Sequence, residues 1–136
     1  MRSVVEAAGE RDEDVCILDT EASPEHLSRG TARYADAMYV VVEPWFKSLE
    51  TGRRMALLAK DLAIPGVGVI ANKISDEREL AAVREFSLQN ELDLVGVVPY
   101  DESLPEAERE QVSPIEHAPD APAIQAIREL AQRLAT

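Results

Sequence analysis

Residues 38–43 read Met-Tyr-Val-Val-Val-Glu, an apolar run that is rich in β-branched side chains and ends in a carboxylate. Similar short apolar runs occur at residues 15–19, 67–71 and 94–98. All are continuously apolar rather than alternating, which is typical of strands covered on both faces of a parallel sheet. The sequence therefore predicts a mostly parallel sheet of about four strands.

Helical patterns separate these runs. Ser48 or Thr51 can cap a helix that continues to about Ala63. Asp76, with Glu79 three residues later, resembles the capping box that opens a second helix. A third, amphipathic helix is expected near the C-terminus from the apolar residues Ile124, Ile127, Leu130, Ala131 and Leu134.

Strands and helices alternate along the chain, with further helices expected over residues 2–10 and 105–111. Such alternation implies crossover connections and helices on both faces of the sheet. The predicted fold class is therefore α/β, a Rossmann-like arrangement of three layers. The length of 136 residues is that of a single domain.

The acidic composition narrows the classes of partner. The formal net charge is −12 and no basic cluster stands out, so binding to nucleic-acid phosphates is not expected. No apolar run approaches the roughly 20 residues of a membrane helix, so no membrane span is expected. The single cysteine, Cys16, cannot form an internal disulfide and lies in an apolar run. We therefore expect a buried, inert thiol in a cytoplasmic protein.

Polar residues follow all four predicted strands, in segments 19–29, 43–48, 72–76 and 99–104, at the edge where parallel sheets bind ligands. Asp19 can hold magnesium through water, or it can be a helix cap or a turn residue. Asn72 offers the amide donor and acceptor that match a base edge, and the stem of Lys73 can cover a planar ring. A polar turn is the alternative there. The loop at residues 99–101 can close over a base, or it can be a plain turn.

Several familiar sites are absent from the sequence. There is no G-x-x-x-x-G-K-[ST] loop that would hold nucleotide phosphates. His26 and His117 are distant in sequence, and neither has a second histidine or cysteine at metal-ligand spacing, so a zinc site is not expected. Trp45 and Phe46 are interpreted as hydrophobic cover or a partner contact rather than as a cofactor platform.

One long pattern carries a family resemblance. It runs Asp19-Thr-Glu-Ala-Ser-Pro-Glu-His26-Leu-Ser-Arg29-Gly30-Thr31, and Glu43-Pro44, Asn72-Lys73 and Val98-Pro-Tyr-Asp101 follow in order. This order resembles the MinD/ParA group of P-loop ATPases, and especially the CooC type, the accessory ATPases of nickel insertion. The resemblance implies a partial P-loop NTPase, with residues 1–136 forming one domain that corresponds to the C-terminal half of such an ATPase.

The resemblance also assigns roles to these residues. Asp19 would be the Walker B acid that acts on magnesium through water, and Glu21 would lie beside it in the catalytic segment. The switch II segment would contain Ser23, Glu25, His26, Arg29 and Gly30. ATP and magnesium are the implied cofactors. The implied nucleotide-binding residues are Asn72, Lys73, Pro99, Tyr100 and Asp101.

The chain departs from the family pattern in ways that bear on activity. The phosphate loop and the Cys-x-Cys motif of the CooC type are absent, and Ser23 replaces a switch II glycine. We therefore expect that the chain alone does not hydrolyse ATP, because most of the clamp on the γ-phosphate is missing. The alternative is a non-catalytic regulatory or assembly module. An unrelated flavodoxin-like or receiver-like domain is the third and weakest alternative, and Asn72-Lys73 stands where a receiver domain needs an aspartate.

Partners are implied as well. In this family a phosphate-loop strand lies between the Walker B strand and the next one, so its absence would leave an open position in the sheet. Rearrangement, a homodimer or a separate N-terminal polypeptide would fill that position, because an open strand edge pairs readily with another chain. The likeness to the CooC type further implies a metalloenzyme client.

Overall fold

A computed structural model describes residues 15–20 and 34–135 of the chain. Its centre is a three-stranded parallel sheet in the order β1 (Ala37–Val42), β2 (Gly66–Ile74) and β3 (Asp93–Pro99). The strands are joined by helical crossovers, as the alternating sequence pattern predicts. The predicted α/β class with a parallel sheet is confirmed.

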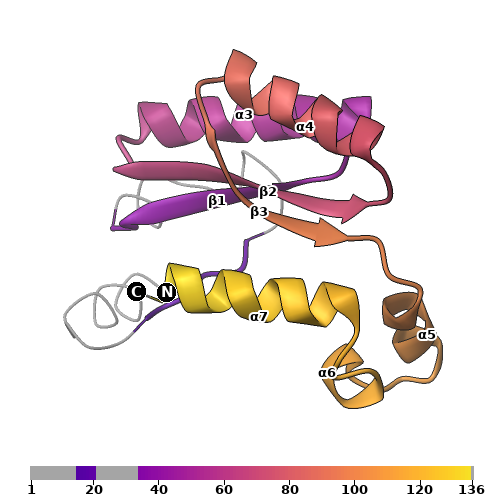
Figure 1. Cartoon of the computed structure of the whole chain (residues 1–136). Coiled ribbons are helices and arrows are strands. Elements are labelled where there is room, and N and C mark those ends of the chain that lie inside the picture. Colours follow the sequence, from indigo (N-terminus) through magenta and orange to yellow (C-terminus); the bar gives the residue numbers. More distant parts are fainter. Residues whose placement is uncertain (1–14, 21–33, 136) are drawn as a thin grey trace.

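Helices cover both faces of this sheet (Figure 1). On one face lie α3 (Phe46–Asp61) and α4 (Glu77–Gln89), and on the other lies α7 (Pro122–Leu134). The short helices α5 (Ser103–Arg109) and α6 (Pro114–His117) connect β3 to α7 beyond one end of the sheet. The layers on both faces confirm the predicted three-layer arrangement. Across the described helices, none combines the length and the apolar character that a bilayer crossing needs.

The larger hydrophobic core lies between the sheet and the α3–α4 layer. Val42, Val69 and Val83 are fully buried there, so β1, β2 and α4 each contribute a β-branched side chain to the same interior. Gly52 lets α3 approach β1 closely, because a Cβ atom at this position would lie 2.6 Å from Cγ1 of Val42. This close contact fixes α3 over the first strand.

A smaller core lies on the opposite face. It contains Ile70, Val98, Ala123 and Leu130, and it joins α7 mainly to β3 and β2. A Cβ atom at Gly96 would lie 2.8 Å from Cδ1 of Leu130, so this glycine lets the helix settle directly on β3. The second core therefore covers β3 and part of β2 on this face of the sheet, and it does not extend to β1.

The expected cap of α4 is present. The Asp76 carboxylate accepts a hydrogen bond from the Glu79 N–H at 2.8 Å, and the Glu79 carboxylate accepts one from the Ser75 N–H at 2.6 Å. These reciprocal bonds satisfy backbone donors that a helix leaves free at its start. The capping-box prediction is confirmed, with the glutamate reaching one residue further back than in the standard motif.

The predicted start of α3 is wrong by a few residues. The helix begins at Phe46, after Trp45, and neither Ser48 nor Thr51 caps it. The Ser48 hydroxyl instead accepts a hydrogen bond from the Glu43 N–H at 2.8 Å, and the Thr51 hydroxyl donates to the Lys47 carbonyl. Ser48 thus ties the end of β1 to the first turn of α3.

The predicted first strand, residues 15–19, is also wrong. Residues 15–20 form no strand, and their side chains are exposed, including that of Cys16, which we expected to be buried. An isolated strand has no partner for its backbone N–H and C=O groups, and no strand in the described ranges pairs with this one. The helix predicted over residues 2–10 lies outside the described residues.

Candidate functional site

The carboxyl ends of the three parallel strands meet at one edge of the sheet, on the right in Figure 1. Glu43 follows β1, Asn72 and Lys73 lie at the end of β2, and residues 99–101 leave β3. Parallel α/β sheets bind ligands at this edge, because the loops and helix starts that follow the strands converge there. The predicted nucleotide-binding residues are thus carried to the same edge.

An ion pair links the ends of β1 and β2. Nζ of Lys73 lies 2.7 Å from Oε1 of Glu43, with the two side chains 57% and 33% exposed. A pair this accessible to solvent adds little stability, because water and salt screen it. Its consequence is geometric, since it places the Lys73 ammonium group beside the carboxylate that follows β1.

The backbone of Lys73 is unusual for a strand residue. Its φ is 56°, which places it in the left-handed region that costs a non-glycine residue about 1 kcal/mol. Pairing slips at this point, because Ala71 pairs with Val97 while Ile74 pairs with Pro99, so β2 carries one extra residue. We expected Asn72 and Lys73 to follow their strand, but they lie inside β2 at this bulge. The bulge re-aims Lys73 toward Glu43.

Asp101 holds the following helices in place. One carboxylate oxygen accepts hydrogen bonds from the N–H and the hydroxyl of Ser103, at 3.0 Å and 2.6 Å. The other accepts one from the N–H of Ala123, at 3.1 Å, in the first turn of α7. Hydrogen bonds from Ser103 and Ala123 lower the pKa of this carboxyl, because they favour its charged form. No sequence pattern indicates this contact, which spans 22 residues.

Tyr100 presents a half-exposed ring beside Asp101. Its hydroxyl donates a hydrogen bond to the Glu102 carboxylate at 2.6 Å, and Arg109 lies 3.4 Å from the other oxygen of Glu102. The bond to Glu102 raises the pKa of Tyr100, and the same bond lowers the pKa of Glu102. The ring is therefore held in one orientation by its own loop.

The predicted catalytic and switch residues are described only in part. Asp19 lies in the exposed stretch of residues 15–20, the first of the two described ranges. The structure brings together no group of three or more potential metal ligands within its described ranges. The remaining predicted residues lie outside those ranges, namely Glu21, Ser23, Glu25, His26, Arg29 and Gly30.

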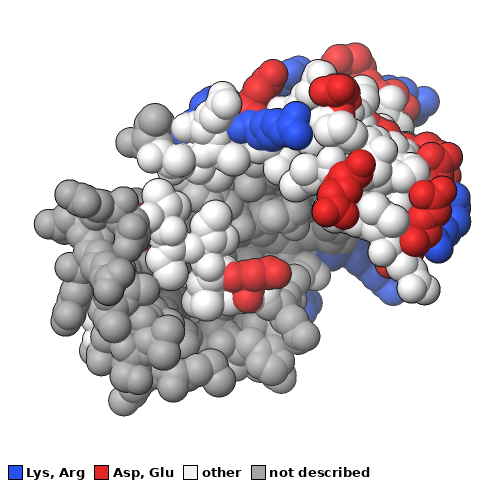
Figure 2. Space-filling view, turned by 90° about the horizontal axis from the view of Figure 1, so that it is seen from below, with Lys and Arg blue, Asp and Glu red and all other residues white. Residues whose placement is uncertain are grey.

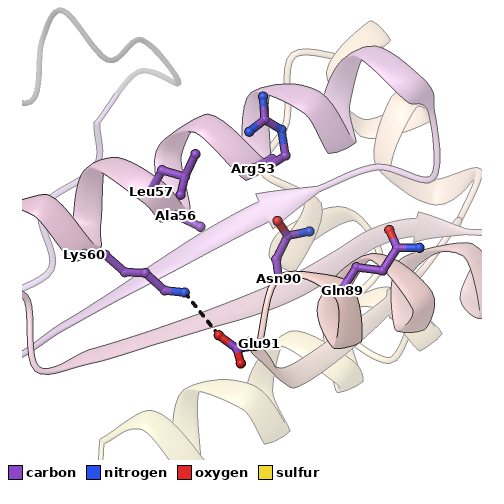
Figure 3. Close-up of a pocket in the computed structure, with 7 residues that line it drawn as sticks. All are labelled: Arg53, Ala56, Leu57, Lys60, Gln89, Asn90 and Glu91. Atoms are coloured by element: carbon purple, nitrogen blue, oxygen red, sulfur yellow. Dashed lines mark ion pairs between the residues drawn. The ribbon is translucent and has the colours of Figure 1, made fainter.

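A hollow lies elsewhere in the molecule, between α3 and the end of α4 (Figure 3). Its volume is about 170 Å³, and an ion pair of 4.0 Å between Lys60 and Glu91 crosses its rim. Its lining residues are Arg53, Ala56, Leu57, Lys60, Gln89, Asn90 and Glu91. Both helices end here, near the amino ends of the strands, so this hollow is separate from the edge that carries Asn72 and Lys73.

The chain has relatives among ATP-binding proteins. It is 43% identical over 96 residues to an uncharacterized ATP-binding protein of Methanocaldococcus jannaschii, covering 71% of this chain and 37% of that protein. It is 33% identical over 99 residues to the carbon monoxide dehydrogenase accessory protein CooC of Rhodospirillum rubrum, covering 72% of this chain and 37% of CooC. No family model matches the chain.

Solved structures of ATPases share the fold. MinD from a MinC:MinD cell division complex of Aquifex aeolicus superimposes with a TM-score of 0.65 and 25% identity, over 78% of this chain and 45% of MinD. The Pyrococcus horikoshii MinD solved with Mg-ADP gives 0.60 and 21%, over 77% of this chain and 43% of that protein. The chain is a partial MinD/ParA-type P-loop ATPase, similar to CooC.

The match to these P-loop ATPases covers less than half of the length of each relative. The chain spans 37% of the length of the first two curated relatives and under half of the two MinD structures. Within that span, homology supports a nucleotide-binding, ATPase-like module.

Two residues of the candidate site were missed as site residues by sequence reasoning. Glu43 directly follows an apolar strand, as Asp19 follows an apolar run, and it lies opposite Lys73 in the structure. Ser48 looked like a helix cap but binds the Glu43 N–H instead. A carboxylate directly after one apolar run, with a lysine two residues after the next apolar run, is the signal that could have identified the Glu43–Lys73 pair.

Proposed function

We propose that residues 1–136 are the C-terminal nucleotide-binding portion of a CooC/MinD/ParA-like ATPase. The observation that carries this proposal is the edge of the sheet where β2 and β3 bring Asn72, Lys73 and residues 99–101 together. The identity of 43% to an ATP-binding protein supports it. By the same relationship, the whole ATPase acts in ATP-driven metallocentre assembly or in partitioning, with a metalloenzyme as one class of client and the cytoplasm as its location.

The proposed base site uses the residues at the carboxyl ends of β2 and β3. The Asn72 amide has the donor and acceptor that pair with a base edge. The Lys73 ammonium group pairs with Glu43, and the apolar stem of Lys73 can cover the ring. Pro99 and Tyr100 form the adjoining wall of the proposed site. The carboxylate of Asp101 fixes the starts of α5 and α7 relative to that wall.

Magnesium and ATP are the proposed cofactors. The Asp19 carboxylate is exposed, so a magnesium ion that keeps its water shell can reach it, and this donor fits binding through water. Glu21 and the switch II residues would respond to the γ-phosphate; in this proposal they are Ser23, Glu25, His26, Arg29 and Gly30. Bound magnesium would supply charge neutralisation at the phosphates.

The second candidate is a non-catalytic regulatory or assembly module. The observation that favours it is the sequence itself, which contains no phosphate-loop motif in its 136 residues. On either account the chain alone does not hydrolyse ATP, because backbone donors and a lysine for the triphosphate are missing.

A titration with a fluorescent ATP analogue, with and without magnesium, separates the two candidates. For a nucleotide-binding portion we expect saturable binding that weakens about tenfold in Asn72→Ala, the loss of roughly one good hydrogen-bonding group. Gln89→Ala, at the other end of the sheet, is the matched control and leaves binding unchanged. Absence of binding in the parent chain supports the non-catalytic module. Magnesium-dependent turnover that Asp19→Asn abolishes would overturn the expected inactivity.

A further inference from the structure

The hollow between α3 and the end of α4 is a separate place where a ligand can bind (Figure 3). We call it the α3–α4 hollow. Ala56 and Leu57 are its apolar lining residues, and its other lining residues are polar. Its volume of about 170 Å³ is that of about six water molecules in the liquid, at roughly 30 Å³ each. The α3–α4 hollow therefore suits a ligand of only about six non-hydrogen atoms.

Lys60 is the cation that the α3 side of the hollow can offer to a ligand. Its Nζ lies 4.0 Å from Oε2 of Glu91, which is longer than a hydrogen bond, and the two side chains are 49% and 87% exposed. Such an ion pair is weak because water screens it. Arg53 is already engaged, since its Nε and Nη2 donate to the Glu50 carboxylate at 3.0 Å and 2.7 Å. Lys60 can therefore exchange its partner more easily than Arg53 can.

Acceptor oxygens belong to the α4 side of the hollow. Nδ2 of Asn90 donates to the Phe86 carbonyl at 2.8 Å, and Nε2 of Gln89 donates to the Glu85 carboxylate at 3.2 Å. Each amide thus uses a donor within its own helix and keeps its carbonyl oxygen for another partner. The carboxyl end of α4 adds partial negative charge, which favours a cation. This side of the hollow suits an ammonium group.

The backbone at Glu91 is strained. Its φ of 54° lies in the left-handed region, and its N–H donates to the Leu88 carbonyl at 3.2 Å just after the helix. Glycine is the usual residue at such a helix end, because a side chain is unfavourable there. The exposed pair with Lys60 is too weak to offset this strain. Strained residues cluster at functional sites, and here the strain places a carboxylate at the rim of the hollow.

We propose that the α3–α4 hollow binds a small α-amino acid in its zwitterionic form. The carboxylate of the ligand pairs with Nζ of Lys60, and its ammonium group donates to Oδ1 of Asn90 and to the Glu91 carboxylate. The ligand thus bridges the 4.0 Å gap between Lys60 and Glu91, and each of its charges meets an opposite charge.

The charges of the chain disfavour the simpler ligands. A phosphate or another simple anion would approach a chain with a net charge of −12 and would meet Glu91 in the same hollow. Basic side chains on another face of the molecule lie among acidic ones (Figure 2). A simple amine would meet the ammonium group of Lys60. The zwitterion avoids both conflicts, because it presents each charge to the wall of opposite sign.

The test follows ¹H–¹⁵N NMR spectra of the full chain during titrations at constant ionic strength. We expect alanine to shift the amide signals of residues 89–91, with saturation at a dissociation constant on the order of 1 mM. Propionate lacks the ammonium group and ethylamine lacks the carboxylate, so each should bind about tenfold more weakly than alanine.

Variants assign the two charges of the ligand. Lys60→Met should weaken alanine binding about tenfold, because the carboxylate loses its cation. Lys47→Met changes an exposed lysine at the other end of α3, so it is the matched control and should leave binding unchanged. Glu91→Gln should weaken the binding of alanine but not that of propionate, which has no ammonium group. Thermal melts establish that the variants fold.

Three results would overturn the proposal. The first is the absence of saturable shifts with alanine. The second is equal binding of propionate and alanine, which would mean a site for simple carboxylates. The third is equal weakening by Lys60→Met and Lys47→Met, which would mean a non-specific attraction to lysines. None of these results depends on nucleotide binding at the opposite end of the sheet, which the titration with Asn72→Ala tests separately.

Discussion

The two outer strands of the sheet have different protection. β3 begins with a charged residue, Asp93, and ends at Pro99, and α7 lies against its underside. β1 has neither kind of residue within its bounds, and the side chain of Val41 is open to solvent on the face away from the main core. Both strands share the cover of the α3–α4 layer. The difference therefore lies on the face of the sheet opposite α3 and α4, where α7 covers the β3 edge and not the β1 edge.

This difference depends on a small number of contacts. Leu130 reaches β3 because Gly96 has no side chain, and the Asp101 carboxylate fixes the start of α7. Under β1 the corresponding surface consists of Tyr39 and Val41, with no described helix packed on it. Single substitutions in these contacts should therefore remove the cover from β3. The packing of α3 over β1 should instead respond to substitutions at other positions.

The largest effect is expected from Leu130→Ala, which should lower the free energy of unfolding by about 2–4 kcal/mol. The leucine is 8% exposed and fills the contact between α7 and β3, so its truncation leaves a cavity and loosens the helix. Urea denaturation measures the change. Ile127→Ala, on the exposed side of the same helix, is the control and should cost less than about 1 kcal/mol. Equal losses in the two variants would mean that α7 does not protect β3 through Leu130.

The next effect concerns the layer above β1. Gly52→Ala should lower stability by about 1–3 kcal/mol, because the new Cβ would lie 2.6 Å from Cγ1 of Val42 and force the helix away from the strand. Gly66→Ala is the matched control, since the nearest atom there is Cβ of Ala37 at 3.4 Å, an ordinary contact. Thermal unfolding of both variants is the measurement. A tolerated Gly52→Ala would show that α3 is less tightly seated than the structure indicates.

Asp101→Asn is expected to cost about 1 kcal/mol at neutral pH, after allowance for solvent screening of its hydrogen bonds. The folded state lowers the pKa of Asp101 below its usual 3.8, so the carboxylate stabilises the fold above that value. This stabilisation is lost as the pH falls through the lowered folded pKa. Urea titrations at several pH values should show parent and variant converging in acid. Asp120→Asn, in the same connection, controls for the loss of a charge and should change stability by less than about 0.5 kcal/mol.

Much of this fold could be predicted from sequence because its signals are local. The apolar runs of all three strands and the capping residues Asp76 and Glu79 have the expected structure. Residues 15–19 have the same composition as a buried strand, yet composition cannot supply a neighbour for the backbone to pair with. The same limit applies to the site. Its residues lie at the carboxyl ends of the strands, as predicted, although Asn72 and Lys73 lie inside β2 at a bulge, and the Asp101–Ala123 bond joins positions that sequence spacing does not relate.

The smallest effect tests the end of the helix that covers β1. Ala63, with a φ of 55°, lies two residues after the end of α3, and its neighbour Ile64 donates a hydrogen bond back to the Ala59 carbonyl at 3.1 Å. Such a helix end favours glycine, because alanine is strained in the left-handed region. Ala63→Gly should therefore raise the free energy of unfolding by about 0.5–1 kcal/mol. Ala81→Gly, inside α4, should have the opposite sign, since glycine destabilises a helix interior by about 1 kcal/mol. A loss of stability in both variants would show that chain entropy outweighs the strain at Ala63, and that the cover over β1 cannot be tightened from this end.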